Sequence, residues 1–283
     1  MPRKNQTFSV TIETITKTNA PQQGQDQLAV EEPLEIRIEG RSVAVTMRTP
    51  GNDLDLAAGF LFTEKVIDGW DDVHAMKHVD SPFDPQGNTV DVVLSSGVPA
   101  MQKHLADRTL FASSSCGVCG KSSIERIFVE APPLMKRPAP DPQIIFSLGK
   151  KLNAEQKVFS QTGGLHAAGL FDFSGNPIVV REDIGRHNAV DKVIGHMLRN
   201  DQVPVEDHIL LVSGRAGFEI VQKALVARIP VVAAIGPPSS LAAQLASKSN
   251  IHLIGFLRNN RYNIYGENSC GPSSISSVVA PPS

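Results

Sequence analysis

Two of the three cysteines of this 283-residue chain stand three positions apart, at Cys116 and Cys119. Serine and glycine surround them in the run SSSCGVCGK, and Lys121 follows at once, so we expect an exposed or mobile loop rather than a core strand. The thiolate is the reactive form of cysteine, and a nearby cation or a CxxC pairing favours it. This segment predicts a cysteine that can carry a chemical group.

The spacing of Cys116 and Cys119 leaves several functions open. A zinc site needs four ligands, and the chain offers no second CxxC or HxxxH pair, only Cys270 and scattered histidines, so we expect no metal here. A thioredoxin-like dithiol normally opens a helix after a strand, and residues 105–115 are not a convincing strand. A sulfur carrier would hold sulfane sulfur on one thiolate as a persulfide. Unreactive structural thiols are usually buried among apolar neighbours, which are missing here.

Composition excludes several classes of protein. Hydrophobic residues make up 41% of the chain and charged residues 20%, which is typical of a globular protein. The net charge of -2 gives no general electrostatic reason to bind nucleic acid or a membrane surface. The first 18 residues lack the apolar core of a signal peptide, and no window approaches a membrane span. We expect a cytoplasmic protein.

The first half of the chain reads as β-rich. Residues 1–30 are polar and predict a poorly ordered N-terminal segment, although 7–16 alternates enough for a strand. Residues 32–47 predict a hairpin that turns at Gly40, and residues 54–66 have helical spacing. A second hairpin is predicted to join 75–79 to 90–94. Together these elements predict a β-rich domain over residues 31–135, which ends in the CxxC loop.

A proline-rich stretch marks the expected domain boundary. Residues 131–142 contain five prolines, and a second domain is predicted over 141–283. It begins with a predicted helix over 144–160. Paired strands over 166–173 and 177–180 and a helix over 188–199 follow.

The rest of the chain alternates between short apolar strands and helices. Strands are predicted at 209–212, 231–235 and 251–256, with helices at 218–227 and 241–248 between them. This βαβαβ order predicts a layered α/β domain with a parallel sheet and right-handed crossovers, within a chain that is α+β overall. Ligands of such sheets bind at the carboxyl ends of the strands.

Three strand ends carry suitable residues, at 213–215, at Gly236 and at 258–261. The first and the last of them could bind a phosphate and a base. Residues 213–217 form a glycine-rich turn before a helix, where backbone N–H groups and Arg215 could bind an anion. Residues 256–261 offer arginines for phosphate and asparagine amides for a base edge. An ordinary turn and a solvated loop are the alternatives. The candidate binding residues are Ser213, Gly214, Arg215, Phe256, Leu257, Arg258, Asn259, Asn260 and Arg261.

A charged cluster lies between these segments. The run REDIGRHN over residues 181–188 follows an apolar strand and precedes a helix. Asp183 with His187 could perform acid/base chemistry. Capping of the helix by Asp183 or Asn188 is the alternative.

Several runs together resemble the FdhD family of formate dehydrogenase accessory sulfurtransferases. The resemblance extends over residues 43–265 in the same order. The motifs that carry it are RTPGND at 48–53, AGFL at 58–61, SSCGVCG at 114–120, TGGLH at 162–166, EDIGRHNAVDK at 182–192 and SGR at 213–215.

The resemblance implies a function and a set of partners. A cysteine desulfurase would load sulfur onto Cys116 as a persulfide, with Cys119 as its companion. The protein would then pass the sulfur to formate dehydrogenase, whose cofactor is a molybdenum bis(molybdopterin guanine dinucleotide). Residues 256–261 correspond to the family's cofactor-binding segment. The family's C-terminal domain is similar to the cytidine deaminase fold, and its members to homodimers.

The chain departs from the deaminase fold in one respect, and two alternative functions stay open. The zinc signature of the deaminase fold is not kept, because His166 is not followed by the catalytic glutamate and no PCxxC run occurs. A dithiol–disulfide oxidoreductase that uses both cysteines is one alternative function. A chaperone that binds the molybdenum cofactor without sulfur chemistry is the other.

Overall fold

The computed structural model describes residues 5–79, 87–96 and 131–266. The CxxC loop with Cys116 and Cys119 lies outside these residues, as does Cys270. The described residues form a mixed α/β structure, which confirms the predicted fold class. The likeness to the cytidine deaminase fold stays a prediction.

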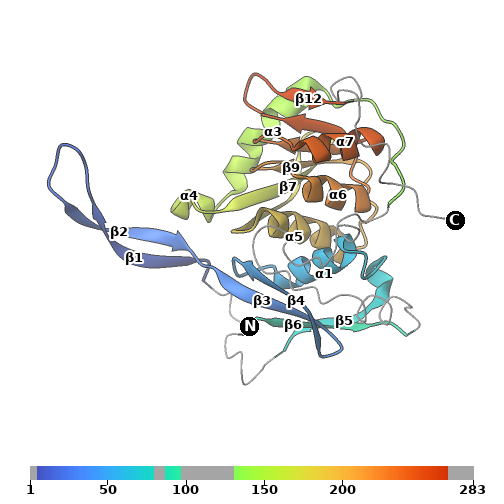
Figure 1. Ribbon diagram of the computed structural model, residues 1–283, viewed down its shortest axis with the longest axis horizontal. Coiled ribbons are helices and arrows are strands. Elements are labelled where there is room, and N and C mark those ends of the chain that lie inside the picture. The colour runs from blue at the N-terminus through green and yellow to red at the C-terminus, as the bar shows by residue number, and fades with distance from the viewer. Residues whose placement is uncertain (1–4, 80–86, 97–130, 267–283) are drawn as a thin grey trace.

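A six-stranded sheet forms the centre of the C-terminal lobe, which we define as residues 131–266 (Figure 1). β9, β10 and β11 are parallel to one another, as the βαβαβ order predicts. β12 is an antiparallel edge strand that was not predicted, and β7 and β8 add an antiparallel pair at the other edge. In spatial order the strands are β12 (Asn263–Tyr265), β11 (His252–Gly255), β10 (Val231–Ala234), β9 (His208–Val212), β7 (His166–Asp172) and β8 (Pro177–Asp183).

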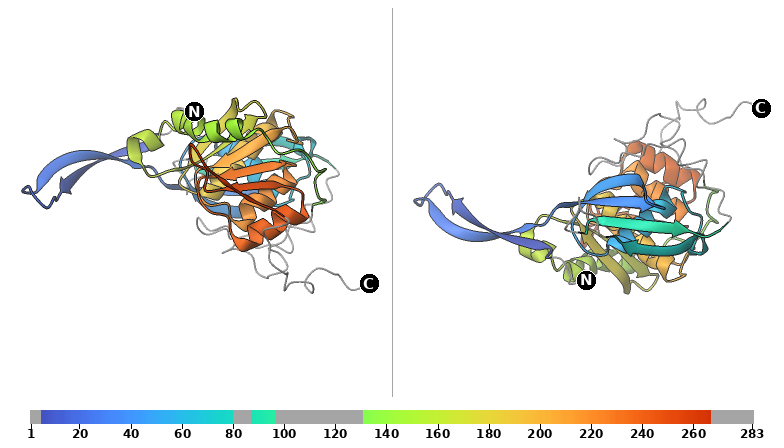
Figure 2. Two further views of the ribbon diagram at one scale, coloured as in Figure 1. Left: turned by 90° about the horizontal axis from the view of Figure 1, so that it is seen from above. Right: turned by 90° about the horizontal axis from the view of Figure 1, so that it is seen from below.

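Helices cover both faces of this sheet (Figure 2). Alternate residues of a strand point to opposite faces. In β9, Ile209 and Leu211 therefore pack with α3 (Pro142–Glu155), while Leu210 and Val212 belong to the larger core on the other side. From the C-terminal lobe, the helices that contribute to that larger core are α5 (Arg186–Arg199), α6 (Phe218–Val226) and α7 (Ser240–Lys248).

The N-terminal lobe, residues 32–96 as far as they are described, packs against α5 mainly through one helix. Its four-stranded sheet contains both predicted hairpins, and α1 (Asp53–Thr63) lies between this sheet and α5 (Figure 1). Buried residues of both lobes form one continuous hydrophobic cluster. The division into two domains at residues 131–142 stays a prediction. The sheet has the order β4 (Arg41–Arg48), β3 (Glu32–Ile38), β6 (Thr89–Leu94) and β5 (Val73–His78).

Two glycines let α1 and α5 touch backbone to backbone. A Cβ atom on Gly59 would stand 1.9 Å from the carbonyl oxygen of Asp191. A Cβ atom on Gly195 would stand 1.8 Å from the carbonyl oxygen of Asp55. Only glycine lacks a Cβ atom. Any other residue at these two positions would hold α1 and α5 farther apart.

The N-terminal hairpin corrects one prediction. Residues 22–29, expected to be poorly ordered, form the strand β2 (Gln22–Ala29), which pairs along its length with β1 (Thr7–Thr14). The two strands extend away from the body of the molecule as an arm (Figure 1). The glutamine-rich sequence resembles a loop, but backbone pairing with β1 does not depend on apolar side chains.

Helix boundaries follow local signals. Asp141 accepts a hydrogen bond from the backbone N–H of Gln143 and starts α3, with proline as its first residue. The predicted helix over 144–160 is interrupted, because α3 ends at Glu155 and a short α4 (Phe159–Thr162) follows. Gly163 ends α4 with a φ of 65°. In the described part of the chain, no helix is long and apolar enough to cross a membrane.

Candidate functional site

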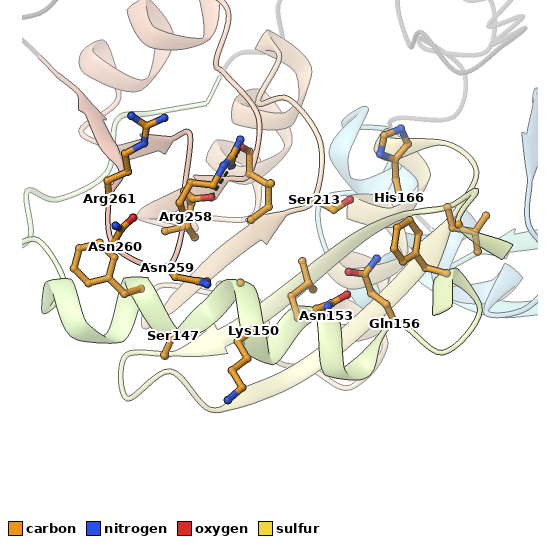
Figure 3. Close-up of a pocket in the computed structure, with 18 of the residues that line it drawn as sticks. Ser147, Lys150, Asn153, Gln156, His166, Ser213, Arg258, Asn259, Asn260 and Arg261 are labelled. Carbon is orange, nitrogen blue, oxygen red and sulfur yellow. Dashed lines mark hydrogen bonds between the residues drawn. The ribbon is translucent and has the colours of Figure 1, made fainter. Parts of the chain in front are cut away.

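A large cavity lies on the α3 side of the six-stranded sheet (Figure 3). Its volume is about 1460 Å³, and the loop after β11 and the polar side of α3 form much of its wall. The residues that line it include three cations and several amides, but none of them is a carboxylate. Its lining polar side chains are Ser147, Lys150, Asn153, Gln156, His166, Ser213, Arg258, Asn259, Asn260 and Arg261.

The loop after β11 is held by backbone hydrogen bonds to the neighbouring strand. Phe256, with a φ of 53°, donates its N–H to the carbonyl of Gly236, and Leu257 donates to Ala234. Leu257 is buried under the loop, and the N–H of Arg258 reaches the carbonyl of Arg261 to close a turn. These contacts hold the polar end of the loop at the cavity.

The two arginines of this loop, Arg258 and Arg261, differ in the contacts of their side chains. Arg258 donates from Nη1 to the carbonyls of Ile235 at 2.7 Å and Leu257 at 2.8 Å, so its guanidinium is oriented by the backbone. Arg261, Asn259 and Asn260 are exposed. Figure 3 shows all four side chains at one end of the cavity.

The polar side of α3 completes this wall and was missed by the sequence prediction. Ser147, Lys150 and Asn153 are spaced by three residues, so they lie along one side of the helix (Figure 3). The signal was present in the sequence, because these positions alternate with the buried Leu148 and Leu152 of the same helix. Nothing in the sequence alone shows that this side of the helix faces the loop after β11.

The predicted turn at 213–215 reaches the cavity only in part. Ser213 lines it, and its Oγ accepts a hydrogen bond from the N–H of Ala167 at 2.9 Å. Gly214, Arg215 and the predicted Phe256 are not among the lining residues. The structure thus brings Ser213 and residues 257–261 together around one cavity.

His166 lines the cavity next to this turn. Burial lowers the pKa of His166 below its usual value, and the nearby charges of Arg186 and Arg215 lower it further. Asp183 acts in the opposite direction. The imidazole is therefore biased toward its neutral form, in which one ring nitrogen donates and the other accepts.

Asp183 and His187 in the charged cluster at 181–188 each contact another side chain. Asp183 makes a 2.6 Å ion pair with Lys192 and accepts the N–H of Gly185 at the start of α5. His187 lies 3.0 Å from Glu219, through Nε2 and Oε2. The hypothesis that Asp183 and His187 perform acid/base chemistry together stays a prediction.

Similar ion pairs lie where the two lobes meet, and we call this set the lobe seam; Arg181–Asp55 links the lobes directly. Lys192 also donates to the carbonyl of Thr49, so the pair with Asp183 links α5 to the N-terminal lobe. Over the described ranges, no group of three or more histidine, cysteine, aspartate or glutamate side chains is arranged to hold a metal ion. The pairs of the seam are Arg48–Asp53, Arg181–Asp55, Lys192–Asp183 and Lys223–Asp191.

Comparison with known proteins identifies the relatives of this chain. The FdhD/NarQ family model matches residues 29–270. "Sulfur carrier protein FdhD" of Nocardia farcinica is 48% identical over 249 residues, which cover 85% of this chain and 86% of that protein. The protein of the same name from Mycolicibacterium paratuberculosis is 46% identical over 248 residues and covers 85% and 90%.

A solved structure shares the fold. The crystal structure of a protein described as a formate dehydrogenase accessory protein from Desulfotalea psychrophila superposes with a TM-score of 0.72. The match covers 92% of this chain and 97% of that one at 23% identity.

Proposed function

The chain belongs to the FdhD/NarQ family, and on this premise we propose that it is a sulfur carrier for formate dehydrogenase. In this proposal, Cys116 accepts sulfur from a cysteine desulfurase as a persulfide. The protein then delivers the sulfur to the bis(molybdopterin guanine dinucleotide) of the enzyme, which is its client. The names of the relatives support the coarser function of sulfur carrier.

The cavity is the observation that carries the client assignment. At about 1460 Å³ it is large enough for a nucleotide-sized ligand, and it is lined by Lys150, Arg258 and Arg261 without a carboxylate. Arginine side chains bind phosphate through paired hydrogen bonds. The amides of Asn259 and Asn260 can both donate and accept, as the edge of a guanine requires. These residues fit a ligand that carries phosphate and a base.

The loading step needs only one reactive thiolate. Cys116 attacks the outer sulfur of the desulfurase persulfide, so a new S–S bond forms on Cys116 while the S–S bond of the desulfurase breaks and its thiolate leaves. No net electron is gained or lost. Lys121 supplies a nearby positive charge that favours the attacking thiolate.

The unloading step explains the second cysteine. Attack by the Cys119 thiolate on the inner sulfur of the Cys116 persulfide forms the Cys116–Cys119 disulfide and releases the outer sulfur as hydrosulfide. The two thiols supply the two electrons that reduce the sulfane sulfur. A CxxC pair is suited to this step, because it brings both sulfur atoms within reach of one another.

Intact-mass measurement after incubation with a cysteine desulfurase and cysteine tests the sulfur chemistry. Wild type and Cys119→Ala should each gain one sulfur, about 32 Da, whereas Cys116→Ala should gain none. A loss of about 2 Da in wild type, together with no sulfur gained by Cys119→Ala, would instead indicate a disulfide formed without sulfur transfer and support an oxidoreductase. If Cys116→Ala still activated formate dehydrogenase fully in cells, the protein would be a cofactor-binding chaperone.

Titration with GDP tests the cavity. The double variant Arg258→Ala, Arg261→Ala should bind GDP at least about tenfold more weakly than wild type, because charge-assisted hydrogen bonds to the phosphates are lost. Arg41→Ala removes one arginine from the start of β4, in the other sheet, and should leave the affinity unchanged. Equal affinities of the double variant and wild type would remove the cavity from the proposal.

A further inference from the structure

His166 lines the cavity at the other end from Arg261 (Figure 3). Arg186 and Arg215 lie near His166, around Gly214. A Cβ atom on Gly214 would stand 3.2 Å from Nδ1 of His166 and 3.9 Å from Cδ of Arg186. Arg215 is the next residue in the chain. Its positive charge and that of Arg186 both lower the pKa of His166.

The two arginines have no counter-ion in the part of the chain that the structure describes. No hydrogen bond or ion pair links the guanidinium of Arg186 or that of Arg215 to another described residue. The carboxylates of neighbouring elements are already used. Asp183 on β8 pairs with Lys192, and Glu219 on α6 pairs with His187.

The turn that carries Arg215 is fixed before any ligand binds. The carbonyl of Gly214 accepts the N–H of Gly236, and the N–H of Ala216 reaches the carbonyl of Pro237. Gly236 allows this approach, because a Cβ atom there would stand 2.8 Å from the Gly214 oxygen. Arg215 on this fixed turn therefore stands near His166 on β7 and Arg186 at the start of α5, and neighbouring positive charges are unfavourable unless an anion joins them.

We propose that His166, Arg186 and Arg215 form a second anion subsite beside the cavity, where His166 lines it, which binds a phosphate or pyrophosphate group of the client separately from the loop at 256–261. The inference rests on the proposed function only for the identity of the client. Two guanidinium groups can each donate paired hydrogen bonds to phosphate oxygens, and a neutral imidazole can add one N–H donor.

Binding at this subsite has a specific electrostatic signature. Burial and the charges of Arg186 and Arg215 lower the pKa of His166, and Asp183 opposes them. A pyrophosphate between these side chains would offset the arginine charges and add an acceptor for imidazolium. The pKa of His166 should therefore rise when pyrophosphate binds. A residue that only supports the fold would not show this response.

The test is a pH titration of histidine-labelled full-length protein by NMR, with and without inorganic pyrophosphate. His166→Asn identifies the His166 signal, which should titrate at higher pH when pyrophosphate is present. Arg215→Gln and Arg186→Gln should each weaken pyrophosphate binding about tenfold or more. Arg41→Gln, which removes an arginine in the other sheet, should have no effect.

The outcomes separate this inference from the proposed function. The subsite is wrong if the His166 signal ignores pyrophosphate, if sodium chloride at equal ionic strength has the same effect, or if Arg215→Gln binds pyrophosphate like wild type. Arg215 is exposed, so this last variant should fold even if His166→Asn does not. With Arg258→Ala and Arg261→Ala together, the His166 response should persist while GDP binding weakens. A persistent response with unchanged GDP binding would overturn only the loop assignment.

Discussion

The lobe seam and the cavity use the same residue types in opposite ways. In the seam, buried charges are neutralised by partners within the fold, as Lys192 is by Asp183 at 2.6 Å. In the cavity, Lys150, Arg258 and Arg261 face a space whose lining residues include no carboxylate. A buried charge without a partner is costly, so the seam pairs must form when the chain folds. Cations that the fold leaves without carboxylates are instead available to a ligand.

The most conspicuous charged run in the sequence, residues 182–192, belongs mostly to the paired kind. The stretch over 182–192 resembles a set of catalytic residues, but, apart from Arg186, its charged side chains contact other elements of the fold. Glu182, for example, accepts the backbone N–H groups of Val158 and Phe159 at the start of α4. The cations that line the cavity come from exposed positions on α3 and after β11.

The largest effect is expected from breaking one pair of the seam. Lys223→Met leaves the carboxylate of Asp191 buried without the partner that lies 2.8 Å away, and should cost about 3–5 kcal/mol in the free energy of unfolding. Urea unfolding measures this loss. Lys150→Met, which removes an exposed cavity lysine, should change the free energy by no more than about 0.5 kcal/mol. Equal losses in the two variants would remove the distinction between the regions.

The pH dependence of this loss sharpens the comparison. Burial raises the pKa of Asp191, and Lys223 opposes that effect. Without Lys223, the folded protein should bind a proton at Asp191 more readily than the unfolded chain does. Stability of Lys223→Met relative to wild type should therefore improve as the pH falls from about 8 toward 5.

A smaller loss of stability is expected from disturbing the close backbone contact between α1 and α5. Gly195→Ala places a Cβ atom 1.8 Å from the Asp55 carbonyl, so α1 and α5 must separate at a cost of about 1–3 kcal/mol. Gly149→Ala in α3 is the matched control, since its Cβ would stand 3.7 Å from Ile235. Alanine is the better helix former, so this control should be neutral or more stable. Equal free energies of unfolding for Gly195→Ala and Gly149→Ala would contradict the close contact between α1 and α5.

The smallest effect should come from histidine protonation. Burial is the main cause that lowers the pKa values of both His166 in the cavity and His196 beside the seam. Below a pH of about 6.5 the unfolded chain takes up protons that these folded side chains resist, so stability should fall as the pH drops. His166→Gln and His196→Gln should each reduce the slope of melting temperature against pH between about 5.5 and 7.5. Unchanged slopes would show that neither side chain resists protonation in the folded protein.

Much of the fold was predictable because its signals are local. Residues 209–212 of β9 and 231–234 of β10 are continuous apolar runs, and the helix between them, α6, has regular apolar spacing. β12 has only three residues, and β2 is rich in glutamine, so neither has a periodic pattern that sequence reasoning can detect. Their pairing depends on backbone hydrogen bonds with neighbouring strands.

The candidate site was predictable only where one segment carries it. The loop at 256–261 directly follows a predicted strand and combines arginine with asparagine. This local composition was enough to predict a candidate binding loop. The contributions of Lys150 and His166 depend on how α3 and β7 pack against that loop, which is a long-range property. The expected roles of Cys116 and Cys119, and the expected homodimer, stay predictions.

The backbone contact between α1 and α5 also bears on cooperativity. Each lobe supplies one of these helices to a common core, so neither lobe can open without exposing the apolar surface of the other. Regions that share a core in this way unfold together and not as separate local units. The cavity therefore draws its rigidity from residues of the N-terminal lobe that never touch it, and a truncation at residues 131–142 would remove that support.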